Sequence, residues 1–409
     1  MSGEYPQTRT LAANLLKAEG GVPVGCRVLH GRLIPALSAA DGAECPENIL
    51  YAAYSATARA FFATADGVLY RVSEDGASAE LSQFTAENPF LTEERGSDGT
   101  SVYVFGDVAY LEYSDGNFKT VLQKPGLRGG CLKNGRIFAV DAEDGSKLRW
   151  SGAGDVKDWN EGIDGAGWAY VGGEYGRILK TAVLRDKLVA VHEYGLTVIS
   201  ASGVPENFRL EKGAQSRSVL GRTAFTTGSS LVFYADGGLY KFDGSEIYEL
   251  KCAKAFGLSE PVCAASAGGE YFISGRIEAC GRSAVLAVNP EEDEAYVIDM
   301  QAEALAAGRG QLYAFCGGRM RAAVTGGRYT FVCGGLDFGT RGVKRLLRLE
   351  ISAAEPITAD IGNGRSVRRF SGVSGVIRPR ISGTDFKITL YGGGEIYSAK
   401  AYAEAFSGN

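Results

Sequence analysis

Histidine is scarce in this sequence, and the cysteines lack the spacing of a metal site. Of 409 residues only His30 and His192 are histidines. The eight cysteines include no Cys-x-x-Cys pair, and zinc sites need ligands at close spacing. Because most of these cysteines lie beside small or apolar residues, we expect buried free thiols of a reducing compartment. They are Cys26, Cys45, Cys131, Cys252, Cys263, Cys280, Cys316 and Cys333.

Long apolar runs and a dominant charge sign are also missing. No run of 18 apolar residues occurs, which predicts no membrane span. The start, MSGEYPQTRT, has neither a basic segment nor an apolar core, so we expect no secretory signal. A net charge of −5 without a basic, aromatic stripe argues against sequence-specific nucleic-acid binding.

Glycine, by contrast, is abundant: 57 of 409 residues, about twice the ordinary share of roughly 7%. The glycines follow short segments in which apolar and polar residues alternate, which is typical of strands. The clearest example is SLVFYADGGLYKFDGSEIYEL (230–250). It predicts strands over 230–234, 239–242 and 246–250, separated by Asp-Gly turns whose positive φ angles suit a hairpin.

The spacing of these turns predicts the architecture. Turn glycines recur with a mean period of 42 residues, and four short strands in each period are typical of β-propeller blades. They are Gly76, Gly116, Gly145, Gly203 and Gly244. We therefore predict an all-β chain: a propeller of about seven blades, with six to eight open, and a small C-terminal antiparallel β-module. A β-sandwich or several small β domains is the alternative.

The predicted domains are an N-terminal arm (1–44), the propeller (45–340) and the module (341–409). Within the arm, residues 7–18 favour a short helix. The module alternates well over 385–390, although strands that close the propeller ring would fit too. A Trp- and Gly-rich stretch (150–176) predicts a loop inserted in one blade. Its tryptophans form either a buried aromatic cluster or a subunit contact; they are Trp150, Trp159 and Trp168.

A search for catalytic motifs leaves little. Neither histidine lies in a Gly-x-Ser-x-Gly turn, and no phosphate-binding Gly-x-x-x-x-Gly-Lys loop occurs. DAEDGSK (141–147) only partly matches a calcium loop, and Ser97-Asp98-Gly99-Thr100 only partly matches a sialidase box. The turn carboxylates are explained by local turn hydrogen bonds; they are Asp75, Asp115, Asp144 and Asp243. We predict no enzyme: no catalytic residues, no cofactor-binding residues, no cofactor and no metal.

An ordered series of motifs then follows from residue 135. Arg149-Trp150-Ser151 ends a strand and precedes Gly154-Asp155-x-x-Asp158-Trp159; Arg185-Asp186-Lys187-Leu188 and Glu193-Tyr194-Gly195 come next. Over about 135–250 this series resembles bacteriophage virion proteins with β-propeller folds. These are tail-accessory or stabilisation proteins that extend the portal and neck, and tail-tip proteins of phages and prophages. SVRRFSGVSGVIRPRISGTDFKITLYG (366–392) more loosely resembles the β-module that often closes them.

The resemblance implies a structural virion protein, assembled in the bacterial host cytoplasm as a homo-oligomeric ring in the neck or tail. Its partners would be further copies of itself and portal, tail or adaptor proteins, without a membrane. The alternative is a carbohydrate-binding or host-adhesion propeller of a tail tip, and a more distant one is a divergent propeller glycosidase.

Charge is distributed unevenly along the chain. Residues 340–409 hold eleven Lys and Arg against six acids, whereas residues 1–170 hold 15 against 23. The basic end, with Arg368 and Arg369, is either a solvated face or a docking surface for an acidic neighbour.

Overall fold

The computed structural model describes residues 8–17, 21–96, 99–114, 116–122, 125–162 and 165–406. In these ranges strands dominate; helical structure amounts to one four-residue helix, α1 (Lys251–Lys254), and five 3₁₀ turns. The 3₁₀ turns are η1 (Leu15–Lys17), η2 (Gly173–Tyr175), η3 (Pro205–Asn207), η4 (Gly221–Thr223) and η5 (Glu278–Cys280). The chain divides into two compact units, one of residues 40–294 and 300–322 and one of residues 1–39, 295–299 and 323–409.

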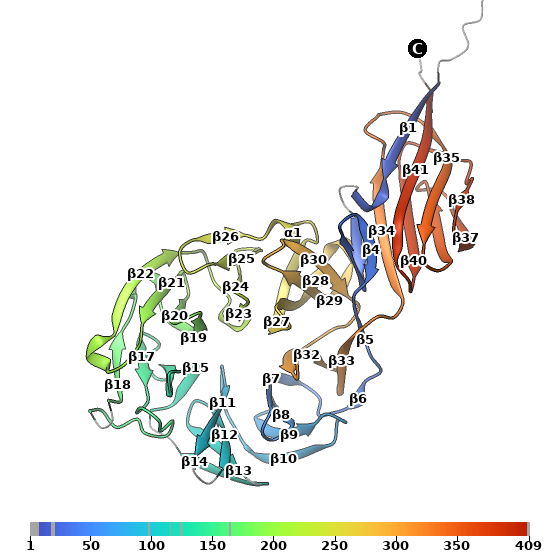
Figure 1. Ribbon diagram of the computed structural model, residues 1–409. Helices are drawn as coiled ribbons and strands as arrows, with labels where there is room; N and C mark the ends of the chain where they lie inside the picture. Colours follow the sequence, from blue (N-terminus) through green and yellow to red (C-terminus); the bar gives the residue numbers. More distant parts are fainter. Residues whose placement is uncertain are drawn as a thin grey trace, which may run out of the picture. The chain divides into compact units, whose positions relative to one another are not determined.

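The first unit contains five four-stranded antiparallel sheets that follow one another along the chain (Figure 1). The first sheet contains β7 (Ile49–Ser55), β8 (Ala60–Ala65), β9 (Val68–Ser73) and β10 (Ser78–Gln83). The second contains β11 (Phe90–Gly96), β12 (Gly99–Phe105), β13 (Ala109–Ser114) and β14 (Asn117–Leu122). The third is β15 (Leu127–Lys133), β16 (Arg136–Asp141), β17 (Lys147–Trp150), β18 (Gly167–Tyr170). The fourth contains β19 (Ile178–Leu184), β20 (Lys187–His192), β21 (Gly195–Ser200) and β22 (Arg209–Gln215). The fifth contains β23 (Phe225–Thr227), β24 (Ser230–Ala235), β25 (Gly238–Phe242) and β26 (Ile247–Glu249).

Two further sheets complete the ring in this unit. One contains β27 (Leu258–Ala267), β28 (Glu270–Ile277) and β29 (Arg282–Asn289); the other contains β31 (Ala304–Gly308), β32 (Gln311–Cys316), β33 (Arg319–Thr325) and β6 (Ala43–Glu44). The last sheet packs against the first, where the Phe61 ring lies 4.8 Å from Tyr313 and 5.4 Å from Phe315. The predicted β-propeller is therefore confirmed, and its sheets fall within the predicted range of six to eight blades.

The blades pack through apolar faces that meet between neighbouring sheets. Between the fourth and fifth blades, for example, Val189 and Val191 share a fully buried cluster with Leu231 and Phe233. The turn between β24 and β25 has φ of 43° at Asp236 and 83° at Gly237, as the Asp-Gly motif predicted. The second strand of a blade buries both faces, as in β8 and β16, where every residue is buried, and this explains its high content of apolar residues.

The second unit is a two-layered β-module. One sheet has the order β3 (Cys26–Leu29), β4 (Arg32–Pro35), β41 (Ile396–Phe406), β35 (Lys344–Ala353), β38 (Val376–Ile377), with β1 (Thr8–Asn14) on β41 and β39 (Ile381–Gly383) on β35. The other runs β30 (Glu294–Ile298), β2 (Gly21–Val24), β34 (Tyr329–Leu336), β40 (Phe386–Gly392), β36 (Ile357–Gly362), β37 (Val367–Val373). The end of β33 pairs with β5 (Leu37–Ala39).

One core joins the two sheets of the module. Phe386, Ile388 and Leu390 of β40 are fully buried together with Ala401 and Ala403 of β41. The expected alternation over 385–390 holds on this face, and Lys387 is exposed. Thr389 is also buried, at 7% exposure, because β40 lies inside its sheet between β34 and β36.

The expected helix over 7–18 is wrong, because β1 pairs with β41 along seven residues and only η1 is helical. Pairing with a strand far along the chain overrides the local helix preference of this segment. The structure also groups residues 1–39 with 323–409, whereas the sequence set 1–44 apart as an arm and began the module at 341. Local periodicity does not reveal pairing between the two ends of a chain.

The stretch 150–176 contains more than the expected loop, since β18 supplies the fourth strand of its blade. Its three tryptophans have separate surroundings. Trp159 is buried against Phe105, Trp150 packs on Phe208, and the Trp168 Nε1 donates to Glu161. The three tryptophans therefore do not form one buried aromatic cluster, which was one of the two alternatives that the sequence left open.

All eight cysteines are free thiols, as expected. Cys26 and Cys333 are buried, and the other six are partly buried.

Candidate functional site

The turn carboxylates are occupied by hydrogen bonds within their own turns. Asp75 accepts from the Ser73 hydroxyl and the Ala77 amide, and Asp243 accepts from the amides of Glu246 and Ser245. These bonds hold the pKa of both carboxyls below the ordinary value. Asp144 likewise accepts from the Ser146 amide. Asp115, Ser97 and Asp98 lie outside the described residues.

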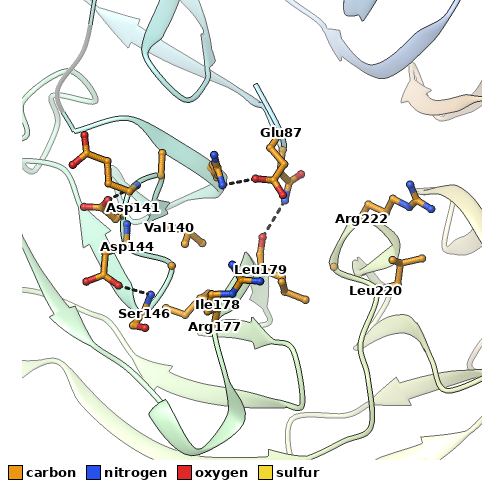
Figure 2. Close-up of a pocket in the computed structure, with 16 residues that line it drawn as sticks. Glu87, Val140, Asp141, Asp144, Ser146, Arg177, Ile178, Leu179, Leu220 and Arg222 are labelled. Carbon is orange, nitrogen blue, oxygen red and sulfur yellow. Dashed lines mark hydrogen bonds and ion pairs between the residues drawn. The ribbon is translucent and has the colours of Figure 1, made fainter. Parts of the chain in front are cut away.

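A cavity of 610 Å³ opens between loops of neighbouring blades (Figure 2). Glu87 and Asn88 precede β11, and residues 140–146 run from the end of β16 into the turn that follows it. Residues 177–179 lie at the start of β19, and residues 220–222 lie at the start of the η4 turn. In Figure 2, Leu220 and Arg222 lie across the cavity from Asp141 and Asp144. The cavity is thus built from segments distant in sequence, which only the ring of blades brings together.

Three arginines and four acidic residues line this cavity, and each arginine has a partner. Arg128 forms a two-pronged ion pair with Asp107, at 2.9 and 3.0 Å, and also contacts Glu87. Arg177 Nη2 lies 2.8 Å from Glu193 Oε1, and Arg222 donates to the Pro261 carbonyl.

Asp141 shows why this cavity is a poor acid–base site. Burial raises the pKa of its carboxyl, but the hydrogen bond from Arg149, at 2.6 Å, and two backbone amides outweigh burial and leave the pKa below the ordinary value. A general acid would need the opposite shift. The Asp141 carboxylate is therefore held in its ionised form by its own neighbours.

A second cavity, of 560 Å³, is lined by the first strands of the blades. Lys180 of β19 reaches this cavity, and its Nζ donates to the Ala224 carbonyl at 2.8 Å. Lys180 was not among the residues predicted from the sequence. Its position in the central channel follows from strands spread over more than 250 residues, and no local motif marks it.

The two histidines lie in a strand and in a turn. His192 is fully buried in β20, with Nδ1 3.1 Å from the Gly176 carbonyl and Nε2 3.0 Å from the Thr197 hydroxyl. Burial lowers the pKa of the imidazole, so the neutral form is favoured. His30 is exposed in the turn between β3 and β4, with φ of 49°.

The β-module carries a groove of its own, of 600 Å³. Tyr391 and Arg369 line it, with the guanidinium 5.6 Å from the ring centroid. Arg369 also forms two hydrogen bonds with Asp360, at 2.7 and 2.6 Å. Arg328, Thr330, Glu355 and Thr358 complete the polar lining.

The two units carry opposite net charge. The module unit holds 16 Lys and Arg against 10 Asp and Glu, a net of +6, whereas the propeller unit holds 27 against 38, a net of −11. Within the module, β37 is the last strand of its sheet and exposes Val367, Arg368 and Arg369. An edge strand has unpaired backbone groups, so β37 offers both hydrogen bonds and positive charge to a neighbour.

In the described part of the chain, no helix is long and apolar enough to cross a membrane. The same residues contain no group of three or more His, Cys, Asp or Glu suited to a metal ion.

Comparison with known proteins returned no matching family model and no matching curated protein. Similar solved structures include PorZ, a surface component of the type-IX secretion system of Porphyromonas gingivalis (13% identity, TM-score 0.47). That similarity covers 81% of this chain and 46% of PorZ, so the chain spans about half of PorZ. The Neurospora crassa Pan2 WD40 domain (11%, TM-score 0.42) matches over 68% of this chain and 89% of that domain. Virginiamycin B lyase from Staphylococcus aureus (10%, TM-score 0.43) matches over 78% and 99%. None of these similarities assigns a function, and the fold itself is an all-β chain with a β-propeller.

Proposed function

We propose that this protein is a structural component of a bacteriophage or prophage-derived particle, and that it forms part of the neck or tail as a ring-like oligomer. The observation that supports the proposal is the opposite charge of the two units, +6 and −11, together with the exposed basic edge strand β37. The motif series over 135–250 adds the resemblance to phage propeller proteins.

In this proposal the module of one copy docks on the propeller of the next. Such a head-to-tail contact uses two different surfaces of one chain, and it closes into a ring when the rotation between copies allows. Complementary charge sets the register and the association rate of this contact, and salt weakens it over a Debye length of about 8–10 Å.

The experiment is mass photometry of the purified protein across a salt series, with Arg368→Glu as the test variant. Arg368 donates to the Pro379 carbonyl but has no carboxylate partner among the described residues, so its reversal removes basic charge from the edge at little structural cost. Arg369 is unsuitable, because Arg369→Glu would place the new carboxylate directly beside the carboxylate of Asp360. We expect a smaller oligomeric fraction at low salt and a weaker salt dependence.

The matched control is Arg276→Glu, which makes the same charge change at an exposed position of β28 on the acidic unit. This variant should keep the wild-type oligomeric fraction. A strictly monomeric wild type that never enters particles would contradict the assembly proposal. Equal assembly of wild type and Arg368→Glu at every salt concentration would contradict docking through β37.

The second candidate is a carbohydrate-binding or adhesive protein of a tail tip, and the module groove favours it. Sugars bind to aromatic faces beside planar hydrogen-bonding groups, and Tyr391 with Asp360 and Arg369 offers this combination. Glycan-array binding that Tyr391→Ala abolishes would favour this candidate over the ring.

A further inference from the structure

The amine of Lys180 is unusual among the charged groups of the propeller. It lies in the 560 Å³ central cavity, which the first strands of several blades line. Its Nζ donates to one backbone carbonyl, that of Ala224, and lies 3.6 Å from the centroid of the Phe225 ring. No carboxylate forms an ion pair with Lys180 in the described part of the chain.

Burial lowers the pKa of the Lys180 ammonium from 10.5 to about 8. The cause is desolvation, because one carbonyl and one ring face replace the water that would stabilise the charge. A lysine in such surroundings is partly neutral near pH 8 and therefore carries a nucleophilic lone pair.

We propose that Lys180 is a nucleophilic amine that forms an imine with small aldehydes entering the central cavity. The Nζ lone pair adds to the carbonyl carbon, and the resulting carbinolamine then loses its hydroxyl and the remaining amine hydrogen as water. The step is reversible and involves no oxidation or reduction. It is independent of the proposed assembly, since Lys180 belongs to the propeller and not to the β37 edge.

The other titratable groups around Lys180 leave it as the available nucleophile. Burial raises the pKa of Cys131 to about 11 and that of Cys263 to about 12, so both thiols stay protonated near pH 8. Burial also raises the pKa of the Tyr51 phenol. The remaining charged and phenolic residues that line the cavity are Tyr54, Glu87, Arg222 and Glu303.

The test is reductive alkylation of the folded protein with acetaldehyde and cyanoborohydride, followed by peptide mass spectrometry. Lys241 is the matched internal control, because it is also partly buried and its Nζ donates to one carbonyl, that of Pro290, at 2.7 Å. At pH 7.5 we expect Lys180 to react about tenfold faster than Lys241 or more, since part of the Lys180 amine is neutral at this pH. Its rate should rise with pH to a midpoint near 8.

Two outcomes would overturn the proposal: equal rates at Lys180 and Lys241, or a rate at Lys180 that is still rising above pH 10. The pH profile needs only the wild-type protein, so the test stands even where Lys180→Arg fails to fold. If Lys180→Arg does fold, fast labelling should disappear, whereas Lys241→Arg should retain it.

Discussion

Buried polar side chains in the propeller are held by specific neighbours, and His192 is the clearest case. His192 is the last residue of β20 and is fully buried. The sequence did not reveal the two groups that hold the imidazole ring, which are the Gly176 carbonyl and the Thr197 hydroxyl. The position of Lys180 was equally hidden, because the channel is formed by strands far apart in the sequence.

The buried imidazole predicts sensitivity to acid. The pKa of His192 is lowered in the folded state, so between the folded pKa and about 6.5 the unfolded chain binds a proton that the folded chain does not. Stability should therefore fall as pH drops below about 6.5, by at most about 1.4 kcal/mol per pH unit from this residue.

The measurement is urea unfolding from pH 7.5 to 5.0 for wild type and His192→Gln, with the exposed His30→Gln as the control. His192→Gln should reduce the loss of unfolding free energy at low pH, and His30→Gln should follow wild type. Identical pH profiles for all three proteins would show that burial of His192 has no role in acid unfolding.

At the level of elements, the Asp-Gly hairpin was the most predictable feature. Strands 230–234 and 239–242 were expected, and β24 and β25 match them within one residue. The turn is determined by two adjacent residues with positive φ, so the local sequence is sufficient to predict the hairpin. The segment 7–18 was predicted wrongly as a helix, because its strand depends on a partner near the other end of the chain.

Gly237→Ala tests the turn directly. The residue has φ of 83°, and a methyl group there would meet no atom within 4 Å, so only backbone strain opposes it. We expect a loss of about 1 kcal/mol in unfolding free energy. Gly173→Ala is the control, since that position is equally open but has no positive φ. Equal effects of the two substitutions would contradict the strain argument.

For the whole molecule, the period of turn glycines predicted the propeller, but the sequence did not reveal how the ends are used. The module draws strands from residues 8–39, from β30 and from residues 323–406. Leu15 and Leu33 are fully buried in its core beside Leu346 and Ile396. The N-terminal segment is therefore integral to the module.

Deleting residues 1–36 removes β1 to β4 and should abolish cooperative unfolding of the module. Limited proteolysis should then cut within residues 344–406 while the propeller blades stay protected. Deletion of residues 1–7 alone, before β1, should leave proteolysis unchanged. A module that remains protected without residues 1–36 would contradict the role of β1 to β4.

The pairing of β1 with β41 also sets a delay during synthesis. Leu11 pairs with Ala403, so about 390 residues are made between the two partners, roughly 20–80 s at 5–20 residues per second. During this interval the blades are completed one after another, while β1 has no partner. Unpaired strand edges associate with other chains, so we expect β1 to be open to chaperones or to aggregation until β41 has been made.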